Sequence, residues 1–491
     1  MNASDITTAV RRPTTAWPLE NALVSAAMAA QRISWIDAPA RALGLKPFTR
    51  QHLTRQVLAQ LRRTARGRPI LLRTAFGTFL APLNAEDARS LIGRAEEAGA
   101  RGAVTGLTSH GRRLRLSAHT PLPVTLASLN TRVRAIAAEE ALELLASRGA
   151  DSVLDRAEWC AVTRRIARRL VLGDGACDDT LIGDILEATL QAADATEYTA
   201  RVAALRRRLD PYLHDPGPNP GPTPDALIAV LPDDGSRNGV IEHVLETVTR
   251  ALTETVPQAL ALASVGPVAP GTDRVEQAVG SALRRYPPLS TTVHEVRAPF
   301  QWRGMGVDSG TEILYATAWL RDVDQGRGHG DEAPSASLCA APAPCAAAEL
   351  AVLVASELTR ALLRHAEPVL LAPHIERDAL PADLPADSLD LALTDVDPYM
   401  TDGTLAPGAG VLTPGAGALA AGSGCARHAA LAAESARSLE EHARQLAACA
   451  QRPGWNHDAF GEQCRMTLLA HAERCARAAV DVSRAARWLA R

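Results

Sequence analysis

Residues 282–322 read ALRRYPPLSTTVHEVRAPFQWRGMGVDSGTEILYATAWLRD, and this stretch does most to decide the fold. It begins as the end of a helix and passes through a Tyr-Pro-Pro turn at 286–288. Strand-like pieces follow near 291–300 and 311–317, on either side of a glycine turn around Gly304. The stretch therefore predicts a helix that leads into a small sheet.

The chain outside this stretch has a mostly helical pattern. Hydrophobic residues make up 47% of the 491 residues and aromatic residues only 3%, so Ala, Leu and Val must fill most of the core. Alanine, leucine and arginine favour helices, and we expect a mainly α fold with small β-sheets. Helices are predicted at 126–149, 155–171, 179–208, 239–264 and 346–365, a β-hairpin followed by a helix at 68–91, and irregular chain at 211–224 and 322–344.

Charge and cysteine usage exclude several classes of protein. The net charge is -3 and no basic cluster stands out, so a nucleic-acid partner is not expected. The eight cysteines show no CxxC spacing and are interpreted as reduced thiols. No apolar run approaches the roughly 20 residues that span a bilayer, and no signal peptide is apparent. A soluble, cytoplasmic protein is the expectation.

The 282–322 stretch resembles one segment of the cytochromes P450, in which a helix carrying an ExxR motif leads through a Tyr-Pro-Pro turn into a small sheet. The matching positions are Arg284, Tyr286, Pro287, Gly304, Gly310, Thr311, Arg321 and Asp322. Residues 159–179 and 343–363 are similar to two further segments of that family. The resemblance covers about residues 45–398 and implies a cytochrome P450-like domain there, after a lead-in over 1–44.

The resemblance makes Cys345 the axial ligand of a haem iron. A thiolate in front of a helix is favoured by the positive end of the helix dipole. In that position it would push electron density through the iron and favour O–O cleavage. The alternative interpretation is that Cys345 is a small buried residue, as most free cysteines are. Cys339 is close enough in sequence to be a rival ligand.

The resemblance also assigns roles to four other residues. Arg284 and His294 would help to hold the cofactor, while Glu254 and Thr255 would be the catalytic acid and threonine of the central helix. Ser281 stands where the family has the ExxR glutamate, so Arg284 loses its usual ion-pair partner. A buried guanidinium without a carboxylate costs a few kcal/mol, roughly, and we expect a substitute partner.

Two functions follow from these assignments. The first is a haem-thiolate monooxygenase that contains haem b and oxidises a small apolar molecule with O2 and electrons from a ferredoxin or reductase. The second is a catalytically inactive relative that acts as an accessory or activator of a partner enzyme. The loss of the glutamate favours the second, as do Ala341 and Ala347 in place of the glycines that flank the family's cysteine.

The C-terminal part has a different character. Residues 399–424 have the Gly, Pro and Ala composition of a linker, and 425–491 predict a helical hairpin. The hairpin weakly resembles small secretion-system proteins with a Trp-x-Gly turn, although residues 455–457 read Trp-Asn-His. Its apolar stripe could bind a helical protein partner. A zinc site from Cys425, His428, His471 and Cys475 is a less favoured alternative.

Overall fold

The structure is a computed structural model that divides into two compact units, Met1–Thr401 and Asp402–Arg491. The described residues are 12–30, 50–107, 113–147, 153–214, 226–266, 273–317, 320, 334–341, 344–373, 375, 380–381, 383–395 and scattered helical positions between 433 and 487. The predicted linker over 399–424 lies outside them, as do Arg321 and Asp322. So do the four Cys and His residues of the alternative tail zinc site.

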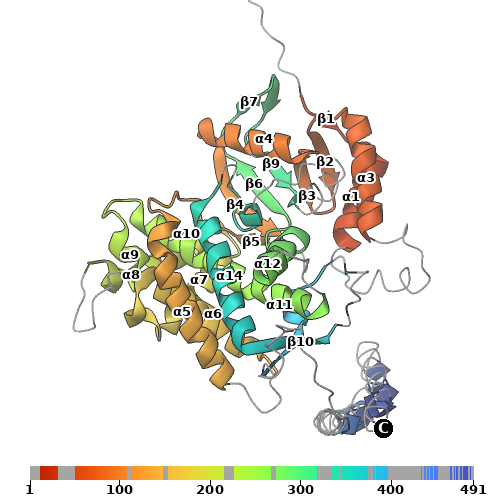
Figure 1. Ribbon diagram of the computed structural model, residues 1–491. Coiled ribbons are helices and arrows are strands. Elements are labelled where there is room, and N and C mark those ends of the chain that lie inside the picture. The colour runs from red at the N-terminus through yellow and green to blue at the C-terminus, as the bar shows by residue number, and fades with distance from the viewer. Residues whose placement is uncertain are drawn as a thin grey trace, which may run out of the picture. The chain divides into compact units, whose positions relative to one another are not determined.

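Helices form most of the first unit (Figure 1). They are α1 (Pro18–Ala30), α3 (Arg50–Ala65), α4 (Ala85–Glu97), α5 (Leu126–Ser147), α6 (Arg156–Leu172), α7 (Thr180–Leu190), α8 (Ala195–His214), α9 (Leu227–Val230), α10 (Arg237–Arg250), α11 (Val256–Val265), α12 (Arg274–Arg285) and α14 (Ala346–His365). Short 3-10 turns lie at η3 (Asp174–Ala176), η6 (Pro334–Ser337) and η7 (Ala386–Ser388).

The largest core packs between these helices. Leu, Val and Ala supply most of it, and Trp159 is its largest fully buried side chain. Helix α14 is buried along much of its length, and it packs against α5 and α10. The face predicted for the 126–149 helix is the buried face of α5, formed by Leu129, Val133, Ile136, Ala137, Ala141 and Leu144. The predicted apolar stripe therefore forms part of this core.

A seven-stranded sheet lies beside the helices, in the order β1-β2-β3-β9-β6-β4-β5 (Figure 1). Its strands are β1 (Thr14–Thr15), β2 (Ile70–Thr74), β3 (Gly77–Ala81), β4 (Arg101–Leu107), β5 (Arg113–Arg115), β6 (Thr292–Val296) and β9 (Glu312–Tyr315). Two antiparallel strand pairs lie outside this sheet, β7 (Phe300–Trp302) with β8 (Met305–Val307) and β10 (Ala366–Ala372) with β11 (Asp390–Asp395).

The expected turn around Gly304 closes the β7–β8 hairpin, and Gly304 adopts φ 75°. That conformation is open to glycine at little cost and is strained for other residues. The fold is therefore mainly α with small sheets, as the sequence predicted. Two details differ from the prediction. Residues 191–194 separate α7 from α8 within the helix predicted over 179–208. Helix α8 also continues through Pro211 to His214, a part of the chain that was expected to be irregular.

One helix changes its winding in the middle. A π-helical stretch, η4 (Ala251–Thr255), joins α10 to α11. Such stretches are rare and often occur at functional sites. Buried residues such as Leu252 and Val256 show that this region lies inside the core. Helix α10 packs against α14, and the candidate site lies between these two helices, before the π-helical stretch begins.

Candidate metal centre

Cys345 is the residue immediately before α14. It is 5% exposed and has an extended backbone, and its carbonyl accepts the first hydrogen bond of the helix from Glu349 N at 3.0 Å. The sequence therefore placed Cys345 correctly at the start of a buried helix.

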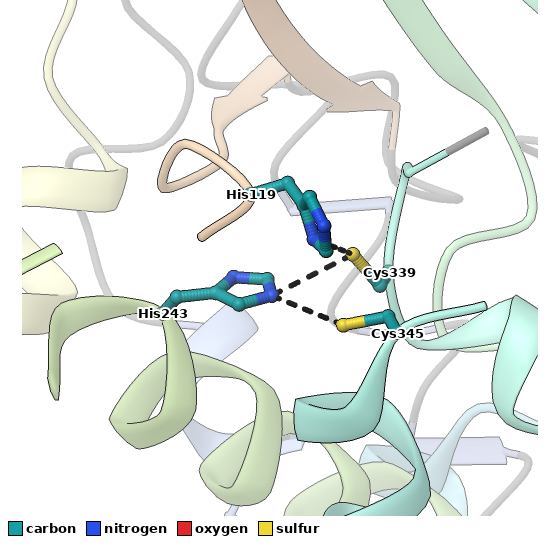
Figure 2. A group of neighbouring side chains, drawn as sticks. All are labelled: His119, His243, Cys339 and Cys345. Atoms are coloured by element: carbon teal, nitrogen blue, oxygen red, sulfur yellow. Dashed lines mark hydrogen bonds between the residues drawn. The ribbon is translucent and has the colours of Figure 1, made fainter. Parts of the chain in front are cut away.

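Three other side chains converge on this sulfur (Figure 2). Cys339 comes from the loop that leads to α14, His243 from the middle of α10, and His119 from the extended segment between β5 and α5. His243 Nε2 lies 3.3 Å from Cys345 Sγ and 3.6 Å from Cys339 Sγ, while His119 Nδ1 lies 3.6 Å from Cys339 Sγ. One ligand atom from each of the four residues falls within 4.8 Å of the others.

The electrostatics of the site favour charge on one sulfur. Hydrogen bonds from Cys339 and then from His119 and His243 lower the pKa of Cys345 well below that of a free thiol, despite burial. The pKa of Cys339 is raised by its hydrogen bond to Cys345 and by burial. Both cysteines are free thiols. Within this pair, the negative charge is therefore favoured on Cys345.

A series of polar contacts positions the segments that carry these four residues. Ser117 Oγ lies 3.4 Å from His243 Nδ1, which leaves Nε2 to face the sulfurs. Ser117 N donates to Glu246 Oε2 at 2.7 Å, and Glu246 pairs with Arg250. Arg250 in turn donates to Leu338 O at 3.2 Å, directly before Cys339. These contacts connect α10 to the His119 segment and to the cysteine loop.

The family resemblance implies a haem at Cys345. A haem iron offers the protein only its two axial positions, since porphyrin nitrogens fill the others. Two ligands on opposite sides of one ion would be about 4.3 Å apart, given roughly 2.0 Å to nitrogen and 2.3 Å to sulfur. His243 Nε2 and Cys345 Sγ are only 3.3 Å apart. Cys339 and His119 also lie beside them, where a macrocycle would need space. As arranged, these residues do not fit a haem.

The structure does not bring the predicted catalytic pair to this site. Glu254 and Thr255 lie in the π-helical stretch, and a rise of 1.5 Å per residue puts Glu254 about 16 Å along the helix from His243. Burial raises the pKa of Glu254, against the charge of Arg156. Thr255 is fully buried, and its hydroxyl has no hydrogen-bond partner among the described residues.

The two predicted cofactor contacts also lie elsewhere. Arg284 is exposed at the end of α12, so water solvates its guanidinium and the expected substitute partner is not needed. His294 lies buried in β6 with its Nε2 3.0 Å from Thr292 Oγ1. Burial, and secondarily the charge of Arg101, lower the pKa of His294 to about 3. It is therefore neutral at ordinary pH.

Sequence reasoning missed His119 and His243. They are separated by more than a hundred residues and belong to no local motif, so spacing could not pair them. A usable signal was the position of His243 among apolar residues of the helix predicted over 239–264. Cys339 was recognised only as a rival to Cys345, whereas the structure places the two side by side.

Comparison with known proteins identifies the fold. CYP108D1 from Novosphingobium aromaticivorans aligns with 78% of this chain and 100% of its own, at 14% identity and a TM-score of 0.50. CYP101J2 aligns with 69% of this chain and 94% of its own, at 16% identity and a TM-score of 0.46. Cytochrome P450-153 from Novosphingobium aromaticivorans aligns with 69% of this chain and 95% of its own, at 13% identity and a TM-score of 0.44.

The similarity to CYP108D1 shows that the chain has the cytochrome P450 fold, as the sequence resemblance predicted. No protein-family model matches the sequence, and neither does any curated protein. None of the helices in the described part combines the length and apolar character needed to span a bilayer.

Proposed function

We propose that this chain is a haem-free protein with the cytochrome P450 fold, which serves as an accessory to a partner enzyme and is not itself an oxygenase. The observation that carries the proposal is the environment of Cys345. Its sulfur contacts His243 and Cys339, and these groups occupy the place that a porphyrin would need. A thiolate enclosed in this way cannot also support oxygen chemistry at an iron.

The other parts of the expected haem machinery support the same conclusion. Arg284 faces solvent, and His294 contacts Thr292 inside the sheet. Glu254 lies three helical turns from the residue that faces Cys345. The core that packs α14 against α5 and α10 is nevertheless complete. A retained fold without a haem site is compatible with an accessory role.

The absorption spectrum of the purified full-length chain tests the absence of haem. The chain is expressed with a haem precursor in the medium, beside a catalytically competent cytochrome P450 as a control. We expect no Soret band in the chain and a strong one in the control. A red-shifted Soret band after reduction and addition of CO would overturn the proposal, since that band requires thiolate-ligated haem.

The accessory role is tested on an enzyme that co-purifies with the chain in fixed stoichiometry. The rate of that enzyme is measured with and without the chain, and in the presence of CO. We expect a higher rate with the chain and no effect of CO. An enzyme whose rate does not respond to the chain, in a complex that is otherwise stable, would contradict the role.

The second candidate is the haem-thiolate monooxygenase that acts on a small apolar molecule with electrons from a ferredoxin or reductase. The fold and the position of Cys345 before a buried helix favour it. It would require His243 and Cys339 to move away from the sulfur. The spectrum described above distinguishes the two candidates.

A further inference from the structure

We infer that His119, His243, Cys339 and Cys345 form a four-ligand zinc site that holds together the centre of the fold. The inference rests on one part of the proposed function, the absence of haem at Cys345. The four side chains come from three parts of the chain, namely the segment before α5, helix α10 and the stretch that leads into α14, and they point toward one another (Figure 2). A Cys2His2 set is one of the common ligand sets of structural zinc.

The three nitrogen–sulfur distances at the site agree with neighbouring ligands of a tetrahedral ion. With zinc about 2.05 Å from nitrogen and 2.3 Å from sulfur, neighbouring nitrogen and sulfur ligands are about 3.5 Å apart. The observed values are 3.3 Å for His243 with Cys345, and 3.6 Å for His243 and His119 with Cys339. These values match neighbouring ligands of one tetrahedral ion more closely than the about 4.3 Å of opposite ligands.

The orientation of the two rings permits both to bind one ion. The imidazole planes of His119 and His243 stand at 84°, with their centroids 5.3 Å apart, so each ring can direct one nitrogen to a common point. Ser117 Oγ contacts the other nitrogen of His243. Metal-bound histidines usually have such a second contact, which fixes the tautomer and the ring position.

The buried surroundings suit a structural ion. Cys339, Cys345 and His243 are all under 10% exposed, and two thiolates would neutralise the charge of a divalent ion. All four coordination positions come from the protein, which leaves none for water or substrate. A tetrahedral S2N2 set selects zinc among common metals. The ion would join α10, α14, the cysteine loop and the segment before α5.

Metal analysis of the full-length chain is the first test. The protein is purified under reducing conditions without chelator, and its metals are measured by mass spectrometry beside its absorption spectrum. We expect one zinc per chain and no haem. Thiol modification of the unfolded chain should find Cys339 and Cys345 reduced, which excludes a disulfide as the reason for their proximity.

Cobalt substitution gives a spectroscopic readout. The chelator-treated chain is titrated with cobalt(II), and we expect the intense visible bands of a tetrahedral ion together with a sulfur charge-transfer band. Cys339→His keeps four ligands, so cobalt should still bind with a weaker charge-transfer band. This variant keeps the test informative if alanine variants fail to fold.

Single substitutions identify the ligands. Cys339→Ala and His119→Ala should each weaken zinc binding by at least about tenfold. Cys177→Ala and His365→Ala are the matched controls, because these residues lie outside the cluster, and both should bind zinc normally. A haem-thiolate site would instead depend on Cys345 and tolerate loss of Cys339.

The outcomes separate the two proposals. Haem in the purified chain would overturn both. A chain that holds neither haem nor zinc, and takes up no zinc or cobalt after reduction, would overturn the metal site and leave the haem-free function standing. Zinc bound with unchanged affinity in both Cys339→Ala and His119→Ala would also overturn the metal site.

Discussion

Replacing Glu246 with alanine should weaken the fold and loosen the candidate metal centre together. The side chain of Glu246 is 2% exposed, pairs with Arg250, and accepts a hydrogen bond from Ser117 N at 2.7 Å. Arg250 is 16% exposed and also donates to Leu338 O. The Glu246 carboxylate therefore stabilises both the segment that carries His119 and, through Arg250, the loop that carries Cys339.

The size of the effect follows from these contacts. Removing one member of a buried ion pair costs about 3–5 kcal/mol, because the other charge is left uncompensated. Arg250 keeps its bond to Leu338 and some contact with water, so we take the lower end of that range. The lost acceptor of Ser117 N adds about 1 kcal/mol. The free energy of unfolding should fall by about 3–4 kcal/mol in Glu246→Ala.

The assay is urea unfolding of the chelator-treated chain, so that no metal contributes to stability. Glu97→Ala is the control, since Glu97 and its partner Arg94 are 70% and 52% exposed. That change should cost less than about 1 kcal/mol. Zinc affinity, measured separately, should fall about 10–100-fold in Glu246→Ala only.

The double variant Glu246→Ala with Arg250→Met should recover much of the lost stability, because it removes the uncompensated charge. A loss in Glu246→Ala no larger than that in Glu97→Ala would refute the reasoning. Such a result would mean that the Glu246 carboxylate does not stabilise the fold through Arg250 and Ser117.

Three further predictions concern the fold around the site. Because burial lowers the pKa of His294 from 6.5 to about 3, only the unfolded chain gains a proton between these values, and stability falls as the pH drops through that window. Between about pH 7.5 and 5 the loss should be about 2 kcal/mol, and urea unfolding of His294→Gln should lack this fall. Asp155→Ala should lower the free energy of unfolding by about 1 kcal/mol, because the Asp155 side chain caps α6 by accepting a hydrogen bond from Glu158 N at 2.9 Å. Equal stability of the variant and the wild type in urea unfolding would show that the cap contributes nothing. Arg284→Ala should change stability by no more than about 0.5 kcal/mol, because Arg284 is exposed, and a loss of several kcal/mol in thermal or urea unfolding would show that it retains a buried partner.

Local patterns predicted the fold well. The apolar spacing that includes Leu129 and Val133 defines a buried helix face, and the Tyr-Pro-Pro turn and the glycine turn around Gly304 bracket strands that the structure confirms. These features depend on residues a few positions apart. Pro211 was misjudged for the same reason, since the last turn of a helix can include proline where its surroundings permit.

The candidate site could be predicted only in part. The family resemblance singles out Cys345, and the apolar helix that follows it is a local feature that agrees with this position. His119 and His243 reach the same point only after β5, α10 and α14 have packed, and no sequence spacing encodes that contact. Glu254 and Thr255 lie in the π-helical stretch between α10 and α11, and the roles that the resemblance gives them stay predictions.

The spread of the four residues along the chain affects when the centre can form. During synthesis the ribosome releases His119 first and Cys345 last, and at about 5–20 residues per second the interval is roughly 10–45 s. No three of the four are neighbours in sequence, so a nascent chain offers only weak, incomplete binding. An ion would therefore bind late, after α10 and α14 have packed together, and its binding would be one of the last steps of folding.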